Sequence, residues 1–552
     1  MKTRNLAFML IDAIILAACS DSSTGLGYTG VKGGGGTGGG GSIDSGGATA
    51  PLLLMTNSGP VRGTLVGATR VFLGIPYAQP PVGDLRWRSP RAVKAWTDVL
   101  DASSRRAACP QIDMMTNAPL AGTSEDCLTL NVWTPAAAST AGVPTLVWIH
   151  GGGFSLGSGG EPAYDGQVLS EATGAVVVTI NYRLGPLGFL AHSALATQDP
   201  SYPSSGNYGF EDQRAALQWT QVNVAAFGGS PHNVTLFGES AGGISVCLHM
   251  LSTKSGGLFH RAILQSGPCT LGTGTTGKEA EGLGDKLAEQ LDCTDPNAVL
   301  ECLRSKTANE VVGAIKPTPT TLTGGGLGWY PNVDGINWLD TPTKLFEAGI
   351  FSKVPTLLGT NKDEGTVFFP PGAPAPTTEA EFSALMEPYF PGRAAQIVAK
   401  YTSAVYGTVK HAAEEAIGDG LFVCPTRMAA RALAGANAPT YVYQFAHAVT
   451  SAAFPGYGAF HGSEIPFIFG NPYWQVTLGA EEQELAKTMR GYWSRMARSA
   501  SPNGGEAPNW PKYDATTESA QVLDLTISTA QGQKRDVCDF WAGLGGGAAP
   551  RF

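Results

Sequence analysis

The most informative part of the sequence is Asn233-Val234-Thr235-Leu236-Phe237-Gly238-Glu239-Ser240-Ala241-Gly242. Its first half is an apolar, β-rich run, and its second half is the pentapeptide G-x-S-x-G. The residues that follow, 243–248, are typical of the start of a helix. Glycines on both sides of Ser240 suit a strand-to-helix turn that is too tight for neighbouring side chains, and such a turn exposes the serine hydroxyl. The stretch predicts that Ser240 is a nucleophile; the alternative is a plain glycine-rich turn.

Similar apolar runs recur along the chain between turn residues, at 143–149, 175–180, 261–264, 354–358 and 441–445. Their apolarity is continuous rather than alternating, which is typical of strands buried on both faces of a parallel sheet. Helix-like stretches, such as 210–219, lie between them. This order predicts an α/β fold with a large, mostly parallel central sheet and helices on both faces.

The chain has 552 residues, more than one small core needs. No second linker follows the N-terminal one, so we expect a single catalytic domain, residues 51–552, with long insertions.

The N-terminus has the features of an export signal. Two basic residues precede an apolar stretch, so residues 1–18 are predicted to be a signal peptide, too short for a stable membrane span. Leu16-Ala17-Ala18-Cys19 resembles a bacterial lipobox, in which Cys19 would be lipidated. Residues 19–50 are rich in Gly and Ser, which predicts a flexible tether. We expect an exported, outer-membrane-anchored lipoprotein, otherwise a periplasmic or secreted protein; a retained N-terminal helix is the alternative.

Composition narrows the classes of partner. The net charge is −9 and the body contains no basic run, which disfavours a nucleic-acid partner because phosphates require a positive footprint. The chain has no C-x-x-C pair and no histidine cluster, so a metal site is not expected. The only membrane contact we expect is through a lipid on Cys19.

A second glycine-rich motif, His150-Gly151-Gly152-Gly153-Phe154, directly follows a predicted strand. Consecutive glycines let backbone N–H groups approach the oxygen that becomes negative when a nucleophile attacks a carbonyl group. Its position upstream of the G-x-S-x-G pentapeptide fits the chain order of such sites, although a flexible loop is the alternative.

A serine nucleophile needs a base and an orienting carboxylate, which follow it in the order acid, then histidine. Two histidines come too early for this order and a third lies on a helix-like stretch; these are His249, His260 and His411. His447 ends a predicted strand and His461 lies in a loop, which favours His461 without excluding His447. For the acid, Asp363 and Glu364 both follow a predicted strand, and the residues alone do not choose between them.

The chain resembles the type B carboxylesterases, the family that includes the cholinesterases. Matching motifs run in the expected order from Gly59 to the C-terminus; they include Gly74-Ile75-Pro76-Tyr77-Ala78, Ser124-Glu125-Asp126-Cys127-Leu128, Asn181-Tyr182-Arg183-Leu184-Gly185 and Gly206-Asn207-Tyr208-Gly209. The resemblance implies an α/β-hydrolase fold with no cofactor. Within Asn361-Lys362-Asp363-Glu364-Gly365 it selects Glu364, and within His461-Gly462-Ser463-Glu464-Ile465-Pro466-Phe467 it selects His461.

The same resemblance assigns roles around this triad. The backbone N–H groups of Gly152, Gly153 and Ala241 would form the oxyanion hole, and Glu239 and Ser266 would support the triad. It also implies two structural ion pairs, Arg86 with Glu125 and Arg183 with Asp212.

Nine cysteines fit an oxidising compartment. By resemblance, Cys109 pairs with Cys127, Cys293 with Cys302, and Cys424 with Cys538. The expectation for the remaining Cys247 and Cys269 is a buried free thiol each.

The resemblance to cholinesterases has a limit. Their loop between the first two paired cysteines carries a tryptophan that binds choline, whereas residues 110–126 here contain no tryptophan. Trp329 and Tyr330 can serve cation–π recognition or simple packing, and the acyl pocket is predicted to include Phe368, Phe369 and Phe460.

These observations predict a serine carboxylic-ester hydrolase that acts on small esters through an acyl-enzyme. The alternatives are a specialised exported esterase for a bulky feruloyl, polyester or toxin ester, and a non-catalytic binding protein of the same fold.

Overall fold

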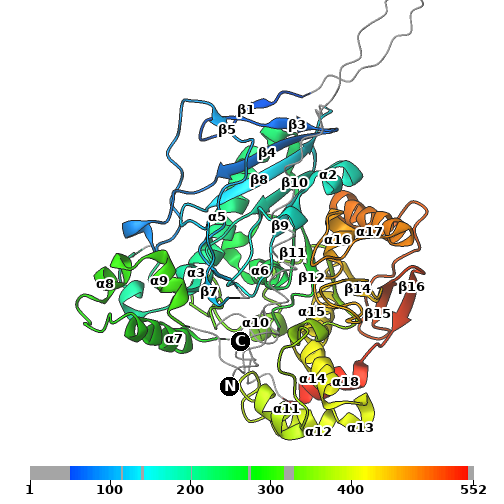
Figure 1. The fold of residues 1–552 in the computed structure, drawn as a ribbon. Helices are drawn as coiled ribbons and strands as arrows, with labels where there is room; N and C mark the ends of the chain where they lie inside the picture. The colour runs from blue at the N-terminus through cyan, green and yellow to red at the C-terminus, as the bar shows by residue number, and fades with distance from the viewer. Residues whose placement is uncertain are drawn as a thin grey trace, which may run out of the picture.

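The computed structural model of the chain (Figure 1) describes residues 50–113, 116–137, 142–200, 202–270, 275–315 and 328–544. The expected signal peptide, Cys19 and nearly all of the expected tether lie outside these residues.

An eleven-stranded mixed sheet forms the centre of the molecule, in the order β16-β15-β14-β13-β12-β11-β9-β10-β8-β4-β3 (Figure 1). The strands are β3 (Thr64–Val66), β4 (Thr69–Pro76), β8 (Thr129–Pro135), β9 (Val143–Ile149), β10 (Val176–Ile180), β11 (Gly229–Glu239), β12 (Arg261–Gln265), β13 (Thr356–Asn361), β14 (Thr440–Phe445), β15 (Ser519–Leu523) and β16 (Ser528–Gln531). All neighbours from β15 to β10 pair in parallel, while the edge strands β16, β8, β4 and β3 pair antiparallel. The predicted parallel centre is confirmed, and the antiparallel edges add to it.

Both faces of the sheet are buried, as the continuous apolar runs predict. Along β9, Leu146 and Trp148 join the hydrophobic core on one face, while Val147 and Ile149 join the core on the other. All four side chains have no solvent exposure. The sheet is therefore the middle layer of three, with helices outside it on each side.

Helices cover the two faces in separate groups. Helices α2, α16 and α17 contribute to one core, helices α5, α6, α7 and α15 to the other, and helices α11, α12, α14 and α18 enclose a third, smaller core. The α-helices are α2 (Gln167–Thr173), α3 (Gly185–Phe189), α4 (Ser193–Ala196), α5 (Tyr208–Asn223), α6 (Ala241–Leu251), α7 (Gly277–Gln290), α8 (Val299–Ser305), α9 (Ala308–Gly313), α10 (Pro342–Glu347), α11 (Glu379–Met386), α12 (Ala394–Lys400), α13 (Ser403–Tyr406), α14 (Val409–Gly418), α15 (Cys424–Gly435), α16 (Ile465–Phe469), α17 (Ala480–Ser499) and α18 (Arg535–Gly543).

Shorter elements complete the fold. They are the 3₁₀ turns η1 (Gly83–Leu85), η2 (Pro162–Tyr164), η3 (Val224–Phe227), η4 (Thr253–Ser255) and η5 (Thr366–Phe368), the π-helical turn η6 (Asp419–Val423), and the short strands β1 (Leu53–Met55), β2 (Pro60–Arg62), β5 (Leu100–Asp101), β6 (Ile112–Asp113) and β7 (Ala118–Pro119).

Four disulfides cross-link the described residues. Three join the expected pairs, Cys109–Cys127, Cys293–Cys302 and Cys424–Cys538. The fourth joins Cys247 to Cys269, so the expectation of two free thiols is wrong. Cys247 lies on α6 and Cys269 follows β12, and the packing of α6 against β12 brings together two cysteines that no sequence motif pairs.

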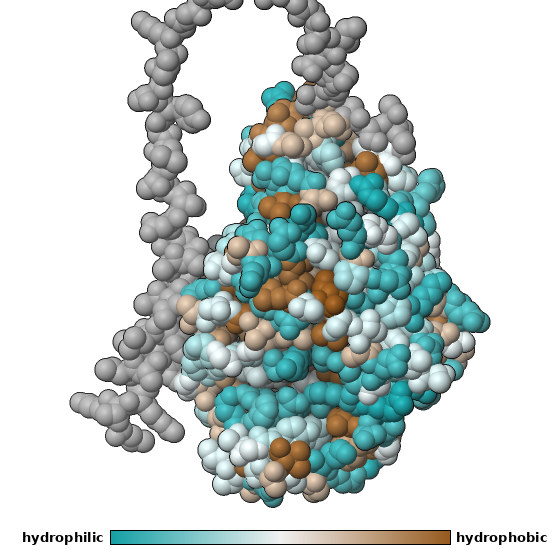
Figure 2. All heavy atoms as spheres, turned by 90° about the vertical axis from the view of Figure 1, so that its right-hand side faces the viewer, coloured by the Kyte–Doolittle hydropathy of each residue, from teal (hydrophilic) through white to brown (hydrophobic). Residues whose placement is uncertain are grey.

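The face shown in Figure 2 is covered mainly by hydrophilic and neutral residues, with its most extended apolar patch near the middle and smaller ones above and below it. Within the described ranges, no helix combines the length and apolarity needed to cross a membrane.

Candidate active site

Ser240 occupies a strained turn between β11 and α6. Its φ is 54° and its ψ is −124°, a conformation that non-glycine residues rarely adopt. A Cβ on Gly242 would lie 2.0 Å from the Ile149 carbonyl oxygen, and one on Gly238 would lie 2.5 Å from the Gly242 backbone. The predicted strand, tight turn and helix are thus present, and the flanking glycines are required by the close approach of the backbone.

The second glycine motif lies directly against this serine. A Cβ on Gly151 would lie 3.1 Å from the Ser240 Cβ. Gly152 and Gly153 have φ of 101° and 57°, in the region that favours glycine, and a Cβ on Gly152 would collide with the Leu156 carbonyl oxygen at 2.4 Å. The loop therefore brings a bare backbone beside Ser240, as an oxyanion hole requires.

Glu364 and His461 form a tightly supported pair. His461 Nδ1 lies 2.6 Å from Glu364 Oε2. The other carboxylate oxygen, Oε1, accepts hydrogen bonds from Ser266 Oγ at 2.6 Å and from the Asn361 backbone N–H at 2.7 Å. A carboxylate on Nδ1 sets the tautomer and leaves Nε2 free to accept a proton.

A second carboxylate lies on the other side of the same ring. Glu239 Oε1 is 3.2 Å from His461 Nε2, and Glu239 directly precedes Ser240. Glu239 is 3% exposed, and burial raises its pKa against the opposing effect of the His461 charge. Burial lowers the pKa of His461, but the neighbouring carboxylates of Glu239 and Glu364 outweigh it and raise that pKa overall. The His461 ring thus lies between two carboxylates, one of which directly precedes Ser240.

The alternative acid and base have structural partners elsewhere. His447 lies 3.0 Å from both Asp524 and Glu482, in contacts that tie the end of β14 to α17. Asp363 Oδ2 accepts a hydrogen bond of 2.8 Å from the Ala459 backbone N–H and so supports the loop that leads to His461. The structure brings neither residue into the cluster around Ser240.

Aromatic residues flank the histidine. The Phe422 ring centroid lies 4.4 Å from that of His461, and the Phe368 centroid lies 5.8 Å from it. Of the three residues expected in the acyl pocket, only Phe368 has this contact, since Phe369 is buried in the third core and Phe460 in another. Sequence reasoning missed Phe422, which lies on the π-helical turn η6; no motif indicates it.

Trp329 and Tyr330 are both buried, and Tyr330 packs edge-on against Phe154 at 5.5 Å. This arrangement fits the packing interpretation of the two residues rather than an open cation-binding surface.

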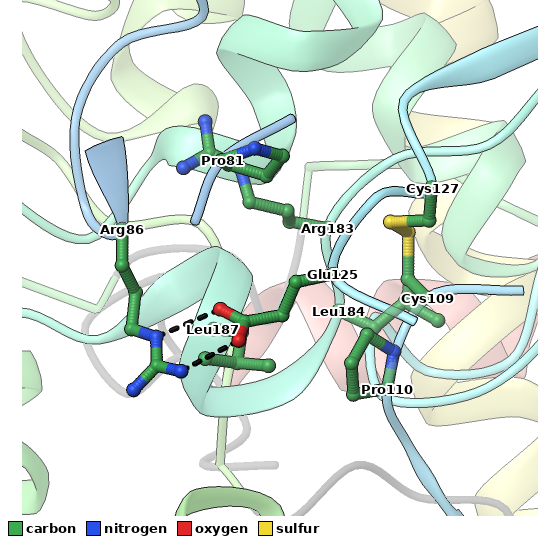
Figure 3. A pocket seen from close by; sticks show the side chains of 9 residues that line it. All are labelled: Pro81, Arg86, Cys109, Pro110, Glu125, Cys127, Arg183, Leu184 and Leu187. Carbon is green, nitrogen blue, oxygen red and sulfur yellow. Dashed lines mark hydrogen bonds and ion pairs between the residues drawn. A yellow bond between two sulfur atoms is a disulfide. The ribbon is translucent and has the colours of Figure 1, made fainter. Parts of the chain in front are cut away.

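Both expected ion pairs are present in the scaffold. Figure 3 shows Arg86 facing Glu125 beside the Cys109–Cys127 disulfide, with 2.7 Å between Arg86 Nε and Glu125 Oε1. Arg183 contacts Asp212 at 2.7 Å through Nε and again through Nη2. These contacts hold the scaffold, because neither pair touches the Ser240 cluster.

Comparisons with known proteins agree with this architecture. The model of the carboxylesterase family matches residues 50–541. The chain belongs to the carboxylesterase family. As a carboxylesterase, it has the α/β-hydrolase fold and is a serine hydrolase of carboxylic esters.

Individual relatives are similar over most of their length. This carboxylesterase is 34% identical to an acetylcholinesterase from Bungarus fasciatus over 535 residues, which cover 90% of this chain and 86% of that protein. It is 35% identical to a cholinesterase from Mus musculus over 532 residues, covering 89% and 86% of the two chains. A solved thermophilic PNB esterase superposes with a TM-score of 0.78 at 32% identity, over 89% of this chain and 99% of that one.

The part of the chain that the structure describes contains no set of metal ligands. No three His, Cys, Asp or Glu side chains gather there in a way that could hold a metal ion.

Proposed function

We propose that this carboxylesterase cleaves its substrates through an acyl-enzyme on Ser240, with His461 as the base and Glu364 as the orienting acid. The observation that carries the proposal is the 2.6 Å contact between His461 Nδ1 and Glu364, together with the contact between His461 Nε2 and the residue that precedes Ser240. A histidine that a carboxylate orients through Nδ1 can accept a serine proton at Nε2, and Glu239 brings the backbone of Ser240 close to that atom.

In the first half of the reaction, His461 Nε2 takes the Ser240 proton as Oγ bonds to the ester carbonyl carbon. The carbonyl oxygen becomes an oxyanion, for which the backbone N–H groups of Gly152, Gly153 and Ala241 are the proposed donors. Ala241 is the first residue of α6, where backbone N–H groups have no partner within the helix. The oxyanion then collapses, the bond to the alcohol oxygen breaks, and Nε2 returns its proton to that oxygen.

In the second half, water attacks the acyl-enzyme and His461 again accepts a proton, so the acid leaves and Ser240 regains its own proton. Glu364 stabilises the imidazolium that forms in both halves. Ser266 holds Glu364 through its 2.6 Å hydrogen bond, and Glu239 flanks Nε2.

The proposed substrates are small carboxylic esters rather than choline esters in particular. The loop between Cys109 and Cys127 has no tryptophan, so it offers no indole for a quaternary ammonium group. Phe368 and Phe422, beside His461, are suited to an apolar acyl group.

We further propose that the protein is exported. Its four disulfides are the kind of cross-link that persists in oxidising compartments. A lipid on Cys19 would then attach it to a membrane.

The test is a series of p-nitrophenyl esters, from acetate to octanoate, hydrolysed by the wild type and by Ser240→Ala. Loss of the nucleophile should lower kcat by about 10⁴-fold or more. Ser252→Ala is the matched control, because Ser252 is buried at the end of the same helix and its hydroxyl has no hydrogen-bond partner among the described residues. Wild-type rates in Ser240→Ala would overturn the mechanism.

A further inference from the structure

Exposed apolar side chains gather on a small sheet at one end of the molecule. The sheet consists of β1, β2 and β5, and Leu53 of β1 pairs with Arg62 of β2. Successive side chains of a strand point to opposite faces. Leu54 of β1 is accordingly buried, while Leu53 and Met55 keep 47% and 67% of their surface exposed. The outer face of β1 is therefore apolar.

The edge of the central sheet adjoins this small sheet and adds to its apolar surface. Only Gly63 separates β2 from β3, and its N–H donates a 3.0 Å hydrogen bond to the Leu52 carbonyl oxygen, just before β1. On β3, Leu65 and Val66 are 49% and 44% exposed. Figure 1 shows β1, β3 and β5 together at the upper end of the molecule, and Figure 2 shows apolar surface at that end as well. Neighbouring exposed apolar residues, unlike single ones, are typical of an interaction surface.

Charge contributes little to this surface. Strands β1, β2, β3 and β5 contain only two charged residues, Arg62 and Asp101. These two residues are opposite in charge, and they lie directly opposite each other in the pairing of β2 with β5. A partner that binds here is therefore recognised by its apolarity rather than by its charge.

The position at which the described chain begins favours a lipid surface as this partner. The Ala50 N–H donates a 2.9 Å hydrogen bond to the Ala136 carbonyl oxygen, and β1 begins shortly afterwards at Leu53. A Gly- and Ser-rich chain of the length from Cys19 to Ala50 has an r.m.s. span of about 30 Å. A folded body of this size is about 60 Å across. A lipid on Cys19 would therefore hold the end that carries β1 and β3 closest to the bilayer.

A second copy of the chain fits this end less well. β3 is the edge strand of the central sheet and has only three residues, so it offers few backbone groups for pairing with another strand. Leu65 and Val66 are consecutive, so their side chains point to opposite faces of that strand. A rigid partner would have to enclose the edge from both sides, whereas fluid acyl chains can surround it.

We propose that β1 and β3 dock the catalytic body onto a lipid surface, with Leu53, Met55, Leu65 and Val66 in the apolar layer beneath the headgroups. The inference rests on the proposed export and on the lipid at Cys19, which supplies proximity, while the exposed side chains supply the contact. Removing these side chains from water is the driving force. Docking fixes the orientation of the active site relative to the membrane, which a Gly- and Ser-rich chain alone leaves free.

The binding test uses a chain that begins at Ser20, which lacks the predicted signal peptide and the lipid-bearing cysteine but keeps every residue of the three described cores. This chain should sediment with phosphatidylcholine vesicles, and Met55→Gln/Leu65→Gln should lower its partition coefficient about tenfold or more. The matched control is Val405→Gln/Leu525→Gln, which should leave the partition coefficient unchanged. These two side chains are 72% and 47% exposed, on α13 and in the loop between β15 and β16 at the opposite edge of the central sheet.

A fluorescent label tests whether this end of the molecule enters the lipid. In the chain from Ser20 each cysteine belongs to one of the four disulfides, so Met55→Cys offers a single thiol for an environment-sensitive fluorophore. Its emission should shift to shorter wavelength when vesicles are added, whereas the emission from Val405→Cys should not. Equal partition of the two glutamine pairs, or equal shifts of the two labels, overturns the proposal.

Two further results would also overturn the proposal. One is binding that needs phosphatidylglycerol in the vesicles and is lost in high salt, because it would show attraction by charge. The other is dimerisation without vesicle binding, abolished by Met55→Gln/Leu65→Gln, which would assign the surface to a second copy. Hydrolysis of p-nitrophenyl acetate by each variant reports folding and tests the proposed mechanism separately. The mass of the N-terminal peptide of the exported protein tests the lipid on Cys19 independently of the docking surface.

Discussion

The two carboxylates beside His461 differ in how the fold supports them. Glu364 lies on Nδ1 and is surrounded by donors, since Ser266 Oγ and the Asn361 N–H both donate to its second oxygen. Glu239 lies on Nε2 and is equally buried, but within the described residues its Oε1 has no hydrogen-bond partner. Burial disfavours a charged carboxylate, whereas hydrogen-bond donors stabilise one. Glu364, which has such donors, is therefore suited to stabilise an imidazolium, and Glu239, whose Oε1 has none among the described residues, is less suited to that task.

The sheet explains why the donors gather at Glu364. Asn361 ends β13, and Ser266 directly follows its neighbour β12, with the Ser266 N–H donating to the Gly359 carbonyl oxygen of β13 at 2.8 Å. The C-terminal ends of two parallel strands thus present a backbone N–H and a hydroxyl to one carboxylate. Glu239 instead ends β11 and faces the glycine loop, where a Cβ on Gly151 would lie 2.8 Å from its Oε2.

Among changes at and near the two carboxylates, Glu364→Gln should have the largest effect. The amide cannot stabilise the imidazolium and favours the wrong tautomer, so kcat should fall by about 10⁴-fold on p-nitrophenyl esters. Asp363→Asn is the matched control, because among the described residues the Asp363 carboxylate accepts a hydrogen bond only from the Ala459 backbone N–H. If Asp363→Asn lost as much activity as Glu364→Gln, the distinction between the two acids would fail.

Removing the disulfide near the supported carboxylate should have an intermediate effect. Cys269 lies three residues after Ser266, and its bridge to Cys247 on α6 spans a sequence separation of 22. The Cys247→Ala/Cys269→Ala variant should lose about 3 kcal/mol of unfolding free energy in the chain-entropy model, measured by denaturant titration.

The control for this variant is Cys293→Ala/Cys302→Ala, whose bridge closes a separation of only 9 and should therefore stabilise less. An unchanged unfolding midpoint in the first variant would show that α6 and β12 hold together without the bridge.

Glu239→Gln should have the smallest effect on rate and a distinctive effect on pH dependence. His461 must be unprotonated to act as a base, and its pKa is raised in part by the Glu239 charge. Removing that charge lowers the pKa of His461, so the acid limb of kcat/KM should move to lower pH while the plateau rate falls by less than about tenfold. An acid limb that stays in place or moves to higher pH would assign no role to Glu239 at Nε2.

Local features of this protein could be predicted from short stretches of its sequence. The parallel centre of the sheet follows from the continuous apolar runs, and the Ser240 turn follows from glycines that leave room for the backbone at Gly238 and Gly242. The antiparallel edge strands were not predicted, because β4 and β8 were recognised only as motifs and not as strands. The parallel strands and the Ser240 turn could be predicted because they depend on interactions between residues close together in the sequence, and a short sequence pattern reflects such interactions.

Contacts between residues far apart in the sequence could be read only from the folded structure. From the residues alone, His447 remained an alternative to His461 as the base, and Asp363 remained an alternative to Glu364 as the acid. The resemblance to the family selected one of each. In the structure, the two residues that the resemblance did not select contact other partners: His447 contacts Glu482 and Asp524, and Asp363 accepts a hydrogen bond from the Ala459 N–H. The Cys247–Cys269 bridge and Phe422 beside His461 carry no motif at all. Proximity across a sheet depends on strand order and helix packing, which are set by burial over the whole chain rather than by the spacing of a few residues.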